Sequence, residues 1–177
     1  MIPRLDKLRK PICGFVAYSG TGKTSLLEKL IPKLRDKNLR IGLIKHAHHD
    51  FDIDYEGKDS YRLRKAGATE TLVASSNRWA LIHEHQMPQE EPDLNTLVGQ
   101  LNQDDLDIIL VEGFKHQHFP RIELYRKSLG KPLLFPEDDS ILAIATDEPL
   151  VFDSDIIQLD LNNTDAIVTF LVSEILK

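Results

Sequence analysis

The chain has 177 residues, of which 41% are hydrophobic and 28% are charged, an ordinary composition for a globular protein with its own buried core. Its formal net charge of −6 argues against a dedicated nucleic-acid binder, because phosphate backbones select basic faces. No apolar run is as long as a transmembrane helix and the single cysteine excludes an intramolecular disulfide, so we expect a cytoplasmic protein without a membrane span.

The first eleven residues are basic and lack the apolar segment that a secretory signal needs. We expect residues 1–11 to form a short solvated lead-in and residues 12–177 to form a single domain. Cys13 lies in the first apolar run of that domain and is expected to be a small buried hydrophobic residue.

A phosphate-binding loop follows the apolar run 12–16, which itself predicts a buried strand. Gly20 and Gly22 let the backbone amides turn inward, where they can meet the negative charge of a triphosphate. Lys23 reaches the outer phosphates, the Thr24 hydroxyl can ligate Mg²⁺, and the next helix directs its positive end at the anion. The predicted nucleotide-binding residues of this loop are Ser19, Gly20, Thr21, Gly22, Lys23, Thr24 and Ser25.

One position of this loop departs from the G-x-x-x-x-G-K-[ST] pattern, since Ala17 stands where the first glycine is usual. Alanine is small enough to be tolerated there. The strand-loop-helix context favours a nucleotide site over a chance match in an ordinary turn.

The residues after the loop have helical periodicity, with Pro32 expected to kink the helix because it lacks an N–H and crowds the carbonyl of Glu28. The apolar face of this helix comprises Leu26, Leu27, Leu30, Ile31 and Leu34. A second short strand is expected over residues 41–44. It is followed by a polar, histidine-rich loop over residues 45–54, which should lie beside the phosphates.

Two residues of that loop are candidates for phosphoryl chemistry. Asp50 is expected to orient a water or hold a metal-bound water, and Lys45 to neutralise charge that develops on a phosphoryl group. The histidines at 46, 48 and 49 also invite a zinc site, but no cysteine lies nearby and no fixed ligand spacing is present. Histidines that hydrogen-bond in a polar loop are the competing interpretation.

The middle of the chain predicts two helices and a hairpin. Asp59 or Ser60 is expected to cap a helix that runs through Arg64 and ends at Gly67. The runs 71–74 and 79–82 flank a Ser-Ser-Asn turn and predict two paired strands. Asp93 is expected to cap a helix over 94–101.

A carboxylate follows the most apolar strand of the chain. Residues 108–111 are four consecutive aliphatics that predict a central strand, and Glu112 comes directly after them, where P-loop proteins hold Mg²⁺. The alternative for Glu112 is a surface glutamate in a turn. Asp107 lies at the other end of the strand and is expected to cap or solvate it.

The last third of the chain adds two strands and a helix. Residues 121–125 alternate in polarity and predict an edge strand, while 141–145 predict a central one. Asp147 follows that strand, where GTPases place a guanine-reading aspartate, because a carboxylate accepts from both N1–H and the exocyclic amine of guanine. A turn cap before Pro149 is the alternative. Asn163 or Thr164 is expected to cap the final helix.

Strands and amphipathic helices alternate along the chain, which predicts an α/β protein with the P-loop NTPase fold. Its sheet should be mostly parallel and doubly wound, with an added antiparallel hairpin or edge strand. Two basic clusters, around Arg62 to Lys65 and between Lys115 and Lys127, can each meet an anion or be solvated faces.

Five segments taken together resemble the molybdopterin-guanine dinucleotide biosynthesis protein B family, MobB. The lysine-histidine loop joined to Val-Glu-Gly-Phe-Lys at this separation is specific, and the likeness runs from about residue 12 through the C-terminus. The segments are Ser19 to Thr24, Leu43 to Asp50, Gly57 to Tyr61, Lys65 to Ala68 and Val111 to His116.

The resemblance implies a homodimeric GTP-binding protein that has at most weak Mg²⁺-dependent GTPase activity. It implies an accessory role beside the guanylyltransferase MobA, which joins GMP to molybdopterin. The basic residues at 115, 121, 126 and 127 are then expected to meet an acidic partner face or the pterin phosphate. An ATP-dependent small-molecule kinase or a dethiobiotin-synthetase-like enzyme, which also carries Val-Glu-Gly after a central strand, is the alternative.

Overall fold

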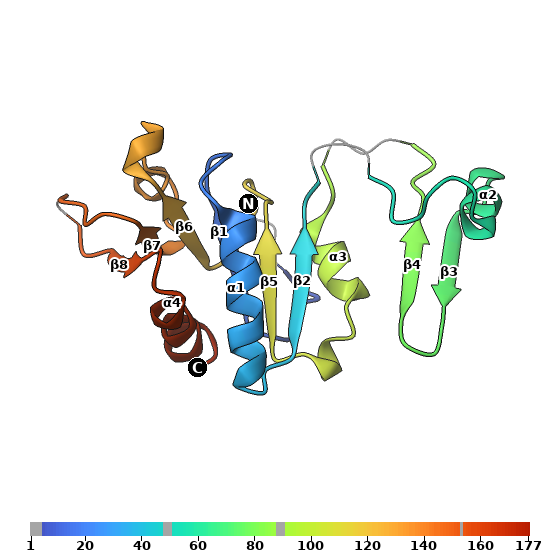
Figure 1. Ribbon diagram of the computed structural model, residues 1–177, viewed down its shortest axis with the longest axis horizontal. Helices are drawn as coiled ribbons and strands as arrows, with labels where there is room; N and C mark the ends of the chain where they lie inside the picture. The colour runs from blue at the N-terminus through green and yellow to red at the C-terminus, as the bar shows by residue number, and fades with distance from the viewer. Residues whose placement is uncertain (1–4, 48–50, 88–90, 153) are drawn as a thin grey trace. The chain divides into compact units, whose positions relative to one another are not determined.

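The computed structural model describes residues 5–47, 51–87, 91–152 and 154–177. It divides into two compact units, one formed by Met1–His46 with Asp93–Lys177 and the other by Ala47–Pro92. Whether residues 12–177 fold as the expected single domain stays a prediction. Figure 1 shows the ribbon of both units.

The first unit contains a six-stranded parallel sheet in the order β2-β5-β1-β6-β7-β8. This confirms the predicted α/β class and parallel sheet. The last strand, β8, was not predicted, because it is four residues long and largely exposed. The strands are β1 Ile12–Val16, β2 Ile41–Lys45, β5 Ile108–Glu112, β6 Arg121–Tyr125, β7 Ile141–Thr146 and β8 Ile157–Asp160.

Helices cover both faces of this sheet, as a doubly wound arrangement requires. On one face, α1 (Lys23–Asp36) and α4 (Thr164–Phe170), which continues as a π-helix over Leu171–Ile175, pack on Phe15 and Leu110. On the other face, α3 (Leu94–Gln100) packs on Ile109 and Val111. Alternate residues of β5 therefore enter two separate cores. Truncating a core residue such as the fully buried Leu30 to alanine should cost about 2–5 kcal/mol.

Helix ends follow the predicted capping with one exception. The Asp93 carboxylate accepts from the backbone N–H groups of Asn95 and Thr96, and Asn163 accepts from Ala166 N. The helix α2 (Asp59–Lys65) instead has Lys58 at its N-cap, with no side-chain hydrogen bond there. Helix α1 continues through Pro32 to Asp36, and its kink stays a prediction. Short 3-10 turns lie at Gln103–Asp105, Lys127–Leu129 and Phe135–Glu137.

The prediction that residues 121–125 form an edge strand is wrong. β6 lies between β1 and β7, and its two charged residues are buried, with Arg121 2% and Glu123 1% exposed. Glu123 accepts hydrogen bonds from the backbone N–H groups of Leu134 and Phe135, and Arg121 pairs with Asp138. Charged residues alternate along β6 because loop residues pair with them in the interior. The alternation does not mark a face of the strand that is exposed to solvent.

The lead-in is also less solvated than expected from residue 5 onward. Leu5 and Leu8 pack against the α3 side of the sheet. The buried Gln103 donates to the Lys7 carbonyl and accepts from the Arg9 N–H at 2.7 Å, so a single amide ties this segment to the unit.

The second unit contains α2 and an antiparallel hairpin of β3 (Glu70–Ala74) and β4 (Trp79–His83), which confirms the predicted hairpin. Gly67 ends α2 with a φ of 116°, as predicted. The Arg64 side chain is 5% exposed and pairs with Asp52 and Glu84. Across the described residues, no helix is both long and apolar enough to span a membrane.

Candidate nucleotide-binding site

Parallel strands bring the predicted site residues to one edge of the first unit. Glu112 at the end of β5 is in register with Phe15 of β1 and with Lys45 of β2. Tyr125 of β6 is in register with Thr146 of β7, so the residues that follow these two strands leave the same edge. The loop after β1, Lys45, Glu112 and Asp147 are thereby gathered where ligands bind in open α/β sheets.

The loop between β1 and α1 has the conformation that its glycines predict. Gly20 and Gly22 have φ values of 83° and 101°, in the left-handed region that favours glycine, and Gly22 is the N-cap of the helix. The Thr21 hydroxyl donates to the Tyr18 carbonyl at 2.8 Å, and Lys23 Nζ donates to the Ala17 carbonyl at 3.1 Å. The lysine thus folds back over its own loop at the start of a 14-residue helix.

Three lysines and one carboxylate lie near one another beside this loop. Lys45 Nζ lies 3.3 Å from Glu112 Oε2, and the Glu112 side chain is 15% exposed. The pKa of Lys23 is lowered, first by burial and then by the nearby charges of Lys115 and Lys45, while Glu112 opposes the shift. Three ammonium groups near one carboxylate leave a net positive potential, although the whole chain is acidic. Such a potential attracts a polyphosphate.

The turn after Glu112 requires its glycine. Gly113 has a φ of 97°, and a Cβ atom built there would lie 2.7 Å from the Cβ of His46. The next residue, Phe114, is buried with a φ of 54°, and its ring lies 5.1 Å from that of His46. The Arg121 guanidinium donates to the Phe114 carbonyl at 2.8 Å. This contact holds a backbone conformation that non-glycine residues rarely adopt.

Sequence reasoning missed the contacts of Arg126. Its Nε donates to the Thr21 carbonyl at 3.0 Å, and its second nitrogen donates to Asp147 Oδ2 at 2.7 Å. The available signal was positional, because Arg126 and Asp147 each come directly after a strand. Only the adjacency of β6 to both β1 and β7 makes the contact possible.

One arginine in each of the two expected basic clusters is not free to meet a partner. Arg121 is buried against Asp138 and stacks on Phe119, and burial lowers its pKa. Arg64 is buried between two carboxylates of the second unit. A charge run in sequence therefore gave no guide to which cations face solvent.

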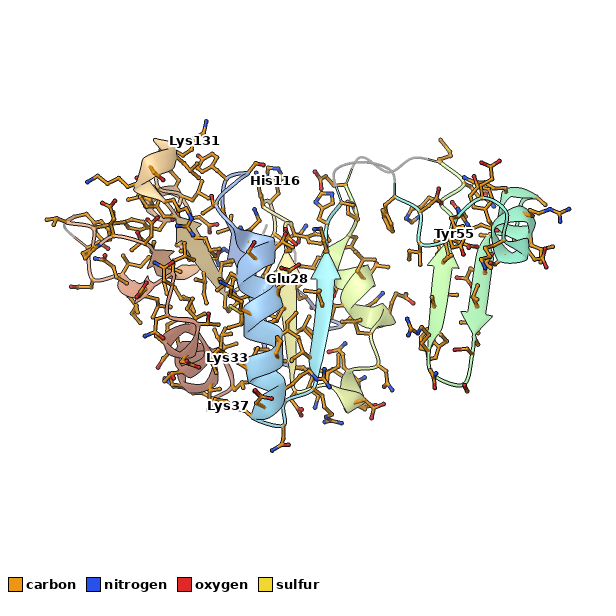
Figure 2. The ribbon with its side chains drawn as sticks, viewed as in Figure 1. Glu28, Lys33, Lys37, Tyr55, His116 and Lys131 are labelled. Atoms are coloured by element: carbon orange, nitrogen blue, oxygen red, sulfur yellow. The ribbon has the colours of Figure 1, made fainter. Side chains whose placement is uncertain are left out.

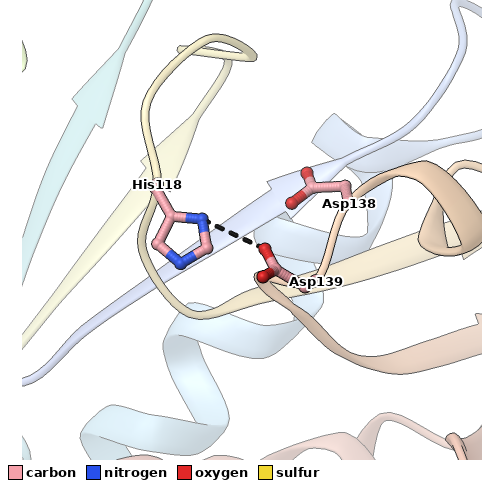
Figure 3. Close-up of side chains that lie close together, drawn as sticks. All are labelled: His118, Asp138 and Asp139. Atoms are coloured by element: carbon pink, nitrogen blue, oxygen red, sulfur yellow. Dashed lines mark ion pairs between the residues drawn. The ribbon is translucent and has the colours of Figure 1, made fainter. Parts of the chain in front are cut away.

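Asp50, with His48 and His49, lies outside the described residues, so its predicted role stays a prediction. Among the residues that are described, one group brings three possible metal ligands together: His118, Asp138 and Asp139 (Figure 3). Asp138 is already engaged by Arg121 and by Ser140, while His118 pairs with Asp139 at 3.4 Å. These existing contacts account for the cluster without a metal.

A pocket of about 320 Å³ lies in the second unit, lined by Arg64, Glu84, His85 and their neighbours. None of its lining residues belongs to the phosphate-binding loop or to the strand ends. The candidate nucleotide site is recognised instead by backbone conformation and charge at the edge of the parallel sheet.

Comparison with known proteins decides the family. A family profile described as "Molybdopterin guanine dinucleotide synthesis protein B" matches residues 12–147. The chain belongs to the MobB family. It is 48% identical over 163 residues to the molybdopterin-guanine dinucleotide biosynthesis adapter protein of Escherichia coli K12, covering 92% of this chain and 91% of the relative.

Other relatives of the MobB family agree. The adapter protein of Haemophilus influenzae is 43% identical over 91% of this chain and 87% of its own length. A crystal structure titled molybdopterin-guanine biosynthesis protein B superimposes with a TM-score of 0.70 at 25% identity, covering 92% of this chain and 98% of the other. A MobB homologue from Bacillus stearothermophilus, at 22% identity and a TM-score of 0.67, shares the fold.

Proposed function

We propose that this MobB family member binds GTP and assists the guanylyltransferase MobA in forming molybdopterin-guanine dinucleotide from molybdopterin in the cytoplasm. One observation carries the proposal: a phosphate-binding loop, a strand-end carboxylate and Asp147 meet at one edge of the parallel sheet. The names of the relatives as adapter proteins support an accessory role.

Asp147 is our candidate for the residue that reads guanine. Its Oδ1 atom is buried and has no hydrogen-bond partner among the described residues, while Oδ2 is occupied by Arg126. A buried carboxylate oxygen without a donor is costly, and guanine supplies donors at N1 and the exocyclic amine. Asp147→Asn should therefore reduce the preference for GTP and raise affinity for xanthosine triphosphate. Competition binding that shows an unchanged preference would contradict this role.

Mg²⁺ is proposed to be held by Thr24 and Glu112, with Asp50 in reach of its waters. Thr24 is the second residue of α1, directly after the loop, and Glu112 ends β5, so hard oxygen donors lie at the edge that carries the phosphate site. When bound, the ion would neutralise charge on the phosphates. Lys23 and Lys45 would stabilise the same charge, which is the contribution that weak GTP hydrolysis would draw from this site.

We propose that the chain forms a homodimer through the hairpin of its second unit. Leu72 and Leu81 are paired in register and lie with Trp79 on one face, where they are 63%, 42% and 65% exposed. A two-stranded hairpin is marginal by itself, and a contiguous exposed apolar face marks an interaction site. A second copy can cover this face with the same apolar face.

The deciding experiment reconstitutes guanylylation from purified MobA, molybdopterin, GTP and Mg²⁺, with and without this protein. We expect the yield of molybdopterin-guanine dinucleotide to rise when the protein is present and to stay low with Lys23→Ala. An unchanged yield, together with ATP-dependent turnover of an unrelated acceptor by this protein alone, would replace the proposal with a kinase or synthetase function.

A further inference from the structure

Arg126 lies between the two parts of the nucleotide site. The strand order places β6 between β1 and β7, so the residue after β6 is flanked by the phosphate-binding loop on one side and by the residue after β7 on the other. Arg126 contacts both neighbours at once, because separate nitrogens of its guanidinium donate to the Thr21 carbonyl and to the Asp147 carboxylate. Its side chain is 33% exposed and that of Asp147 is 21% exposed.

The bond to Thr21 bears on the phosphate end of the site. A trans peptide holds its C=O and N–H on opposite sides, so fixing the Thr21 carbonyl toward Arg126 turns the Gly22 N–H away from it. Gly22 is the left-handed residue at the N-cap of α1, where an amide can donate to a phosphate. The Thr21 hydroxyl bond to Tyr18 braces the same peptide from within the loop.

The hydrogen bond from Arg126 to Asp147 affects the part of the site where the base is proposed to bind. Arg126 occupies Oδ2 and leaves Oδ1 buried without a partner among the described residues. A guanidinium is planar and donates along fixed directions, so it fixes the orientation of the carboxylate. The free oxygen is held ready to accept from a ligand donor.

We infer that Arg126 is a positioning residue that sets base specificity by locking Asp147 to the phosphate-binding loop. The inference rests on the proposed function, because it takes Asp147 as the residue that reads guanine. Arg126 need not touch the nucleotide. It acts through Asp147 on the base and through Thr21 on the phosphates.

The test compares GTP, inosine triphosphate and inorganic triphosphate by calorimetry. Inosine keeps N1–H but lacks the exocyclic amine, so the ratio of the dissociation constant of inosine triphosphate to that of GTP reports the hydrogen bond from this amine to Asp147. We expect the parent ratio to be roughly 10 to 100, as for a hydrogen bond to a charged group, and to fall about tenfold with Arg126→Gln. Inorganic triphosphate should bind the Arg126→Gln variant about threefold to tenfold more weakly than it binds the parent protein.

A double-mutant cycle separates this role from a structural one. In an Asp147→Ala background, Arg126→Gln should leave the inosine-to-guanine ratio unchanged but still weaken triphosphate binding. The matched control is Arg35→Gln, at the far end of α1 near Lys37, which Figure 2 shows well away from the loop. Arg126→Lys keeps the charge but lacks two separately placed donors, and serves if the glutamine variant is unstable.

Three results would overturn the inference. An equal loss of GTP and inosine triphosphate affinity with an unchanged ratio would make Arg126 merely structural. A ratio that falls with Asp147→Ala but not with either Arg126 variant would leave the base assignment intact and remove Arg126 from it. A ratio unaffected by Asp147→Ala would refute the guanine-reading proposal, and the specificity role of Arg126 with it.

Discussion

The parallel sheet of the first unit buries its apolar residues, whereas the hairpin of the second unit exposes them. Residues Ile108 to Val111 of β5 are all 0% exposed, whereas Leu72 and Trp79 of the hairpin are 63% and 65% exposed. The sheet is covered by helices on both faces and can therefore hold its strand-end residues rigidly. The hairpin exposes the apolar area that another surface would cover. This difference is the reason that we propose ligand binding in the first unit and self-association through the second.

The largest effect should come from removing the lysine of the phosphate-binding loop. Lys23→Ala should weaken GTP binding about 100-fold or more, because it deletes charge-assisted hydrogen bonds to the phosphates. Calorimetry measures the affinity and sedimentation measures the dimer, which should persist. Unchanged GTP affinity in the folded variant would refute the assignment of the site, and loss of the dimer would refute the division of roles between the units.

A charge on the apolar face of the hairpin should weaken the dimer and leave GTP binding unchanged, the reverse of the result expected for Lys23→Ala. Leu72→Glu places a carboxylate in each copy of the proposed interface and should weaken self-association at least about tenfold, while GTP affinity stays at the parent value. Sedimentation velocity across a concentration series measures the dissociation. Ser76→Glu, in the exposed turn between β3 and β4, is the control with the same charge. A dimer as tight as the parent would place the interface elsewhere.

Neutralising Glu112 tests whether the carboxylate at the end of β5 holds Mg²⁺. Glu112→Gln removes a charged oxygen ligand and releases Lys45, so the Mg²⁺ concentration for half-maximal GTP hydrolysis should rise about tenfold. A Mg²⁺ titration at saturating GTP measures it, and Asp107→Asn at the opposite end of β5 is the control. Superimposable titrations would make Glu112 a structural partner of Lys45 alone.

The smallest effect is expected on stability, at the ion pair of Arg40 and Asp107 at the end of β5 opposite Glu112. Hydrogen bonds from Arg40 lower the pKa of Asp107 to about 2, so the pair stabilises the folded state above the unfolded pKa of about 4. That contribution is lost as the pH falls through about 2. The difference in free energy of unfolding between the parent and Asp107→Asn should therefore be constant near neutral pH and shrink between pH 4 and pH 2. Urea unfolding at several pH values measures it, and a difference that does not change with pH would show that the ion pair contributes nothing.

Much of the fold could be predicted from the sequence because its signals are local. The glycine pattern of the phosphate-binding loop, the aliphatic run of β5 and the turn of the hairpin each determine nearby backbone geometry. Helix caps at Asp93 and Asn163 are equally local. β8 was missed since a short, exposed strand has no periodicity that distinguishes it from a loop.

By itself, then, the sequence determined the conformation of the phosphate-binding loop, the carboxylate at the end of β5, the hairpin and the family to which the chain belongs. Only the tertiary structure decided that β6 is an inner strand, that Arg121 is buried beneath the turn after Glu112, and that Arg126 connects Thr21 with Asp147. The physical reason is that these contacts join residues up to 105 positions apart. Which charges become neighbours across such separations depends on strand order, and strand order is set by the packing of the whole sheet.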